Sequence, residues 1–351
     1  MSRIRVGVIG AGSWAVASHL PNLALDPDVE FVAVARKGPE QLQRIKDKFG
    51  FEVASEDFRD VLAADIDVCV VASPASVHHQ HVTAALDAGA HVMCEKPFTI
   101  ATDEAWDLVS RANERDLQLI IAFGSNYLPM VQQAKALMTE IGIGTLEQIS
   151  IVMSSTTREL MTNTGSYPNA DPDAIPEQAT WTDPAISGGG YGQAQLTHAL
   201  GLGLWLTDAR VSSAFAYLGS PMDAPVELHD AVAFRCDGGA VGVLSGGSSH
   251  LGANSNKHAL EVRAIGSEGQ LQVDLERELV YIFKDGREYR ADVVDGDGLI
   301  HCKGPIDALL AAARGDFTAN ASPGELGART VEALDLAYRS ARTGHAENRG
   351  S

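Results

Sequence analysis

The fold is decided by one stretch near the start of the chain, Arg5-Val6-Gly7-Val8-Ile9-Gly10-Ala11-Gly12-Ser13-Trp14-Ala15. A buried strand runs into the pattern G-x-G-x-x-A, and a helix follows. Gly10 permits a tight turn, Gly12 lets the backbone approach a pyrophosphate, and Ala15 keeps the helix close to the sheet. The helix N-terminus offers free N–H groups to phosphate oxygens. We therefore predict a dinucleotide site that includes Gly10, Gly12, Ser13, Trp14 and Ala15.

The rest of the first third repeats this strand–helix alternation. Apolar runs at 29–35, 68–72, 91–94 and 119–123 are separated by helical stretches such as 40–49 and 77–88. Continuous apolar runs are typical of parallel strands that are covered on both faces. Residues 1–123 are thus predicted to form an α/β dinucleotide-binding Rossmann domain with a doubly wound parallel sheet.

The pattern changes after residue 124. Apolar residues alternate with others around 231–236, 260–264 and 279–283, and the turns Asp237-Gly238-Gly239 and Asp285-Gly286 are hairpin signals. Residues 124–351 are predicted to form an α+β domain for substrate binding and oligomerisation, with an open, mostly antiparallel sheet. The last helix, about 323–342, is expected to pack back on the first domain, and the tail 346–351 to fray. Apolar residues on both sheet faces indicate a homodimer or homotetramer.

Composition excludes several classes of function. The chain has 351 residues, which suggests two domains, and its 27 basic and 46 acidic residues give a net charge of −19. An acidic surface repels nucleic acids and anionic membranes, so neither is an expected partner. The four cysteines form no Cys-x-x-Cys pair, and we predict no metal site. With no apolar run long enough to span a bilayer, a cytoplasmic protein is expected.

The end of the second predicted strand favours one coenzyme. NAD-binding sites of this kind carry an acidic residue there, which accepts from the ribose 2′-hydroxyl. This chain has Arg36-Lys37 instead, two cations that suit a 2′-phosphate. NADP(H) is therefore favoured. NAD(H) stays possible if Arg36 only stacks on the adenine.

Two further motifs resemble those of a known family. Ser73-Pro74-Ala75-Ser76-Val77-His78 follows the third apolar run, and Glu95-Lys96-Pro97 ends the fourth. Together with Gly188-Gly189-Gly190 and His198, they resemble the glucose–fructose oxidoreductase/inositol dehydrogenase family (Gfo/Idh/MocA). The resemblance implies a two-domain NAD(P)-dependent oxidoreductase that acts on a CH–OH group of a sugar, inositol or related polyol.

The resemblance also implies roles for individual residues. Lys96 would lie beside the nicotinamide and exchange a proton with the reacting oxygen, while Ser73, Pro74, His78, Glu95 and Lys96 would contact the cofactor. His198 would be a second catalytic residue. The family's Asp-x-x-x-His pattern is broken here, because its Asp position is Ala194. Gln195 is a substitute that can bond substrate or imidazole but carries no charge.

Several weaker substrate contacts follow. Asn126 stands where the family often has Arg, so an anionic substrate group is not expected there. The irregular segment 160–190 and its neighbourhood provide lid candidates, namely Arg158, Tyr167 and Trp181. His19, on the first helix, is interpreted as structural. Two other functions stay open: an NAD-dependent glycoside-cleaving enzyme that oxidises its sugar transiently, and a non-enzymatic dinucleotide-sensing regulator.

Overall fold

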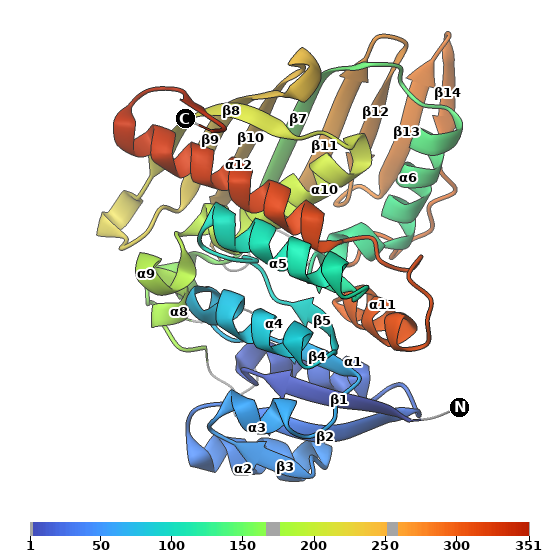
Figure 1. Cartoon of the computed structure of the whole chain (residues 1–351). Helices are drawn as coiled ribbons and strands as arrows, with labels where there is room; N and C mark the ends of the chain where they lie inside the picture. Colours follow the sequence, from blue (N-terminus) through green and yellow to red (C-terminus); the bar gives the residue numbers. More distant parts are fainter. Residues whose placement is uncertain (1–2, 166–175, 251–258, 351) are drawn as a thin grey trace.

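The computed structural model describes residues 3–165, 176–250 and 259–350, and its first sheet is parallel throughout (Figure 1). Six strands lie in the order β3-β2-β1-β4-β5-β6, as the alternation of apolar runs predicts. Their bounds are β1 (Ile4–Ile9), β2 (Val29–Ala35), β3 (Val53–Ser55), β4 (Val68–Val71), β5 (His91–Cys94) and β6 (Leu119–Ile121). The strand order reverses between β1 and β4, which is where such sheets bind ligands at their carboxyl edge.

Helices cover both faces of this sheet, which explains why its strands are apolar without alternation. One face carries the π-helical segment η1 (Ala15–His19), α1 (Leu20–Leu23), α2 (Pro39–Phe49) and α11 (Lys303–Ala313). The other carries α3 (Phe58–Leu62), α4 (His78–Asp87), which follows the 3-10 turn η2 (Ala75–Val77), and α5 (Thr102–Glu114). Although α11 comes from near the end of the chain, it packs against the first sheet beside β5 (Figure 1).

The second sheet is open and mostly antiparallel, as predicted. Its order is β14-β13-β12-β11-β7-β10-β9-β8-β15, and the β7–β10 pair is parallel. Asp285 and Gly286 have the positive φ angles of a tight hairpin turn between β13 and β14. The bounds are β7 (Leu146–Ser155), β8 (Val211–Gly219), β9 (His229–Cys236), β10 (Val241–Ser248), β11 (Ala259–Gly266), β12 (Gly269–Asp274), β13 (Leu279–Lys284), β14 (Arg287–Arg290) and β15 (Glu347–Asn348).

One face of the second sheet is covered by α6 (Pro129–Glu140), α10 (Thr197–Thr207) and α12 (Gly324–Thr343) (Figure 1). The other face is open and keeps apolar side chains exposed, with Tyr217 72% and Val243 43% accessible. In β13 the residues that face the helices are Val280 and Ile282, while Phe283 lies on the open face. No helix within the described ranges combines the length and apolar character that crossing a membrane requires.

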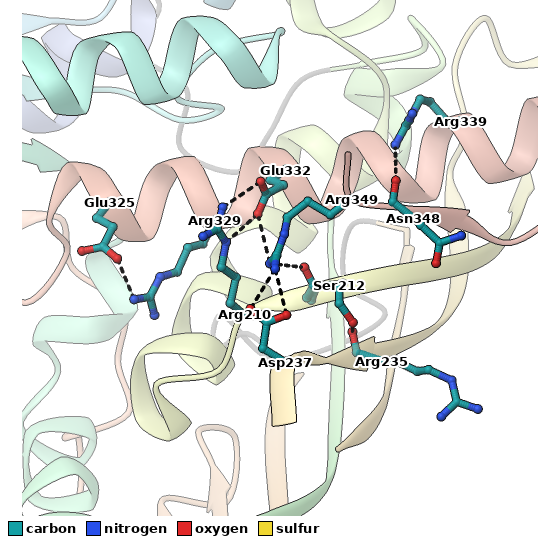
Figure 2. A network of polar contacts seen from close by, with 11 residues as sticks. Arg210, Ser212, Arg235, Asp237, Glu325, Arg329, Glu332, Arg339, Asn348 and Arg349 are labelled. Atoms are coloured by element: carbon teal, nitrogen blue, oxygen red, sulfur yellow. Dashed lines mark hydrogen bonds and ion pairs between the residues drawn. The ribbon is translucent and has the colours of Figure 1, made fainter. Parts of the chain in front are cut away.

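The C-terminal tail is not frayed, and this expectation was wrong. Residues 347–348 form β15, which pairs with the edge strand β8. The next residue, Arg349, donates its backbone N–H to Ser212 O at 2.9 Å, and its guanidinium pairs with Asp237 at 2.9 Å (Figure 2). Arg210 and Glu332 complete this network at 2.8 Å. Chain ends commonly fray, but edge pairing and ion pairs hold this one in place.

The irregular segment also contains more structure than expected. Among its described residues are three one-turn helices, α7 (Arg158–Met161), α8 (Ala179–Thr182) and α9 (Pro184–Ser187). Asp183 caps α9 by accepting from the Ala185 N–H. The short turns η3 (Gly124–Tyr127), η4 (Gly192–Leu196), η5 (Pro221–Asp223) and η6 (Asp237–Gly239) connect other elements. Tyr167 lies outside the described residues.

Candidate active site

A cavity of about 1280 Å³ lies at the carboxyl edge of the first sheet. Its walls come from both parts of the chain, from the glycine turn after β1 to η4, α8 and the residues before α11. Of the residues predicted from the sequence, it is lined by Gly10, Gly12, Ser13, Trp14, Arg36, Lys37, Ser73, Pro74, Glu95, Lys96, Trp181, Gln195 and His198. Residues that are up to 190 positions apart in the sequence are thus brought to one site.

The glycine turn fits a dinucleotide phosphate. Gly10 has φ +85°, and a Cβ there would lie 2.3 Å from Ser73 N, so only glycine is accommodated. At Gly12 the nearest atom to such a Cβ is Gly10 O at 3.9 Å, so a side chain would project into open space that a bound pyrophosphate needs. Ala15 is buried behind the turn and does not line the cavity.

The end of the cavity beside β2 is rich in charge. Arg36 donates from Nη1 to Ala11 O at 3.2 Å, and Lys37 donates to Glu56 O at 3.1 Å. Arg44 and Arg59 add two further cations that the sequence analysis missed, and Glu56, Asp57 and Glu177 bring carboxylates. Burial lowers the pKa of Arg36, although the charge of Glu177 opposes this. Arg36 nevertheless stays protonated, as guanidinium groups do in proteins.

The Ser-Pro turn after β4 is held by two histidines with different roles. His81 Nδ1 lies 2.8 Å from Ser73 Oγ, and the His81 ring packs on the ring of Phe58. His81 and Phe58 both line the cavity. Burial, together with His78, lowers the pKa of His81 to about 4, so this ring is neutral near pH 7. His78 does not line the cavity: it is fully buried, with Nε2 2.6 Å from Ser73 O and Nδ1 3.0 Å from Pro97 O.

Lys96 lines the cavity beside the helix that begins at η4. It follows β5, and its Nζ donates to Ala194 O at 2.8 Å, across from the second part of the chain. The Trp181 ring lies 5.7 Å from Nζ. Burial lowers the pKa of Lys96 and outweighs the attraction of Glu95 and Cys302, which would raise it. A lysine with a lowered pKa is suited to exchange protons near neutral pH.

Glu95, beside it, is a buried carboxylate with fixed partners. His19 Nε2 lies 2.7 Å from Glu95 Oε1, and the Lys96 backbone N–H donates to Oε2 at 3.0 Å. Burial would raise the pKa of Glu95, but the hydrogen bond and charge of His19, together with Lys96, lower it overall. Glu95 therefore stays ionised beneath the lysine.

The opposite wall is the helix that carries Gln195 and His198. It begins as the π-helical segment η4, so the spacing of an ordinary helix does not apply, yet both side chains reach the cavity. The buried carboxylate of Glu227 anchors η4 by accepting from the N–H groups of Gly190 and Gly192 at 2.8 and 3.2 Å. The His198 ring stands edge-on to Phe123 at 5.9 Å between centroids.

Two of the predicted substrate contacts do not reach the cavity. Asn126 is buried below it and donates from Nδ2 to Ala321 O at 3.0 Å. Arg158 turns toward residues 248–250, with Nη1 3.0 Å from His250 Nε2. In the structure both side chains therefore have protein partners and do not line the cavity.

The cavity is also lined by a set of hydroxyl groups that were not predicted from the sequence. Ser155, Thr156 and Thr157 line the cavity at the end of β7, and Thr180 lines it from α8. The sequence has four consecutive hydroxyl residues at 154–157, but it does not show which strand pairs with this segment or toward which side its side chains point. Cys302, before α11, also lines the cavity, and burial raises the pKa of its thiol to about 11, so it is a neutral thiol near pH 7.

Comparison with known proteins agrees with the glycine turn and the two-sheet fold. Residues 4–123 match the oxidoreductase family with an NAD-binding Rossmann fold, GFO/IDH/MocA, and residues 131–272 match the GFO/IDH/MocA C-terminal domain. D-glucoside 3-dehydrogenase of Escherichia coli (strain K12) is 29% identical over 229 residues, which cover 65% of this chain and 58% of that protein. Scyllo-inositol 2-dehydrogenase (NADP(+)) IolU of Bacillus subtilis (strain 168) is 29% identical over 140 residues, which are 40% and 42% of the two chains.

The chain spans about half the length of the curated relatives it matches. Among solved structures, levoglucosan dehydrogenase in complex with NADH and levoglucosan has a TM-score of 0.79 at 20% identity and is covered over its full length. At this identity the likeness is one of fold. Both halves of the chain match models of one family, so the chain belongs to the Gfo/Idh/MocA family of oxidoreductases with an NAD-binding Rossmann fold.

Proposed function

We propose that this chain transfers a hydride between a nicotinamide dinucleotide and a carbinol or ketone carbon of a sugar, inositol or related polyol. The observation that carries the proposal is the half-buried ammonium of Lys96. It projects into the cavity that the glycine turn shares with His198 and Gln195, and burial lowers its pKa. Loss of hydride from a carbinol needs a group that removes the hydroxyl proton, and Lys96 is placed to do so.

The residues divide into three tasks. Gly10, Gly12 and the turn at Ser73 hold the dinucleotide, whose nicotinamide supplies the hydride chemistry when it is bound. Lys96 holds or releases the proton of the reacting oxygen. His198 orients the substrate from the opposite wall. Residues 1–123 thus bind the dinucleotide and supply Lys96, and residues 124–351 supply the other contacts to the substrate.

The substrate is a polyhydroxylated molecule. Thr156 and Gln195 offer a hydroxyl and an amide group that can both donate and accept, and the Ser155 hydroxyl, which donates to Tyr191 Oη, can still accept. Such groups suit a ring of hydroxyl groups. The relatives named above act on a glucoside and on an inositol according to their names. For the coenzyme we propose a preference for NADP(H), because Arg36, Lys37, Arg44 and Arg59 line the end beside β2.

The test compares two substitutions in the cavity with a matched control. Lys96→Met keeps the stem and removes the donor, so kcat should fall by ~10²–10⁴, the usual worth of a positioned acid or base. Coenzyme affinity should stay within a few-fold. His198→Asn should do less. The control is Lys135→Met, because Lys135 likewise donates to a carbonyl, Trp205 O, and lies over a Trp ring, yet does not line the cavity.

Activity is followed as coenzyme reduction at 340 nm with a panel of sugars and inositols. A Lys96→Met enzyme that retains more than about half of its activity would overturn the proposed role of Lys96. Deeper loss in His198→Asn than in Lys96→Met would exchange the two roles. Substrate turnover without net coenzyme reduction would instead favour the glycoside-cleaving alternative.

A further inference from the structure

We propose that His19 is a positioning residue for Lys96: it holds the Glu95 carboxylate in place and so keeps it from pairing with the Lys96 ammonium. This inference rests on the proposed function of Lys96 but concerns a residue from a different element. His19 ends η1, the π-helical segment that follows the glycine turn, and it is completely buried. It does not line the cavity, so its effect must pass through Glu95.

The geometry fixes the direction of the hydrogen bond. Glu95 is an ionised carboxylate, which can only accept, so the proton of the 2.7 Å contact belongs to His19 Nε2. The second carboxylate oxygen accepts from the Lys96 backbone N–H. Both oxygens of Glu95 thus have partners, and Lys96 Nζ donates to Ala194 O instead. The lysine faces the cavity although a carboxylate is its neighbour in sequence.

Without His19 this arrangement would be unstable. Oε1 of Glu95 would be a buried charge without a partner, which is costly. The adjacent cation is the Lys96 ammonium, and pairing with it would draw Nζ away from Ala194 O. The same pairing would favour the charged form of the lysine and weaken it as a proton acceptor.

Other titratable groups face this pair, but each has a different relation to it. Cys94, Cys302 and His78 interact with the charge of Glu95 from β5, from the residues before α11 and from α4. His198 reaches the cavity from the far wall. Burial raises the pKa values of Cys94 and Cys302, so both are neutral thiols, and His78 bonds backbone carbonyls. The hydrogen bonds to the Glu95 carboxylate come instead from His19 and from the Lys96 backbone N–H.

The decisive measurement is the pH dependence of kcat/KM for alcohol oxidation at saturating coenzyme. The acidic limb, where kcat/KM falls at low pH, reports the deprotonation of Lys96. In His19→Leu this limb should move to higher pH by about one unit. At pH values below the limb, kcat/KM should then be about tenfold lower than in the wild type, and it should recover at high pH. Coenzyme affinity, measured by fluorescence quenching, should change by less than a few-fold.

Two amides provide a geometric control. The amide nitrogen of Gln stands as many bonds from Cβ as Nε2 of His, whereas that of Asn stands where Nδ1 does. His19→Gln should therefore restore the wild-type limb and His19→Asn should not. If His19→Leu fails to fold, this pair carries the test. His79→Gln is the matched surface control, because His79 pairs with Asp107 at 2.8 Å and does not line the cavity.

A double substitution tests the route through Glu95. Glu95→Gln removes the charge, so the limb should move to lower pH, and adding His19→Leu should then shift it no further. An unchanged limb in both His19→Leu and His19→Asn, or an equal shift with and without Glu95→Gln, would overturn the inference. These results leave the role of Lys96 untouched, because that role stands or falls with Lys96→Met alone.

Discussion

Replacing Arg36 with Asp tests how the chain chooses its coenzyme. Arg36 follows the last residue of β2, and its half-buried guanidinium lies beside the glycine turn, 3.2 Å from Ala11 O. An aspartate here would restore the acidic residue that NAD-binding sites carry at this position. The substitution therefore removes a cation that suits a 2′-phosphate and adds a carboxylate that repels it.

The magnitude follows from this exchange. A hydrogen bond to a charged group contributes about 1.5–3 kcal/mol, and the lower half of that range applies to a partly exposed guanidinium. With the added repulsion, the total cost for NADP(H) is about 2–3 kcal/mol, which corresponds to a ~30–150-fold weaker Kd. NAD(H) has no 2′-phosphate, so its Kd should change by no more than a few-fold or improve.

Both Kd values can be measured by quenching of tryptophan fluorescence, since Trp14 and Trp181 line the cavity. Lys48→Asp is the control: it makes the same change in charge on the same domain, and Lys48 does not line the cavity. A wild-type protein that binds NADH more tightly than NADPH, with neither affinity altered in Arg36→Asp, would refute the reasoning. Arg36 would then only stack on the adenine.

Three other predictions concern association and stability. Sedimentation should give a dimer or tetramer at micromolar concentration, and Tyr217→Asp on the open sheet face should shift it to a smaller species; a clean wild-type monomer would count against this interface. Deleting residues 346–351 should lower Tm by ~2–4 °C, since the β15 pairing and the half-exposed Arg349 pair contribute about 1 kcal/mol. Burial, together with Glu227, raises the pKa of Asp230, so its folded form binds more protons than its unfolded form and its contribution to stability falls as pH rises above about 4. Asp230→Asn should therefore raise Tm relative to the wild type, and the increase should be larger at pH 8 than at pH 5. An equal difference in Tm at both pH values would contradict the assignment.

The fold was largely predictable because its signals are local. Apolar runs such as Val68–Val71 and glycines such as Gly10 act within a few residues, and both indicate one topology. The tail was not predictable, because Arg349 is held by Asp237, 112 positions away. The one-turn helices in the segment 160–190 were not predictable either, since they depend on capping contacts such as that of Asp183 more than on periodicity.

The place of a site residue was predictable where a motif fixes the backbone. It was not predictable where the orientation of the side chain determines whether the residue reaches the cavity. Lys96 follows a strand whose carboxyl end must face the cavity, so its place could be predicted. Asn126 follows the next strand, but its side chain turns down to Ala321 O, and no pattern reports that rotation. His19 was interpreted as structural because its partner, Glu95, is 76 residues away.

The arrangement around position 194 explains why we rank Lys96 above His198. Where the family pattern has Asp, this chain has Ala194, so no carboxylate from that position can orient the imidazole or stabilise its charged form. The carbonyl of the same residue accepts from Lys96 Nζ at 2.8 Å. The contact orients the lysine without adding a second negative charge, which would favour the protonated amine. In the proposed mechanism, the absence of a carboxylate at 194 would make His198 the weaker acid or base of the two, and Glu95 would be the buried negative charge that His19 keeps away from Lys96.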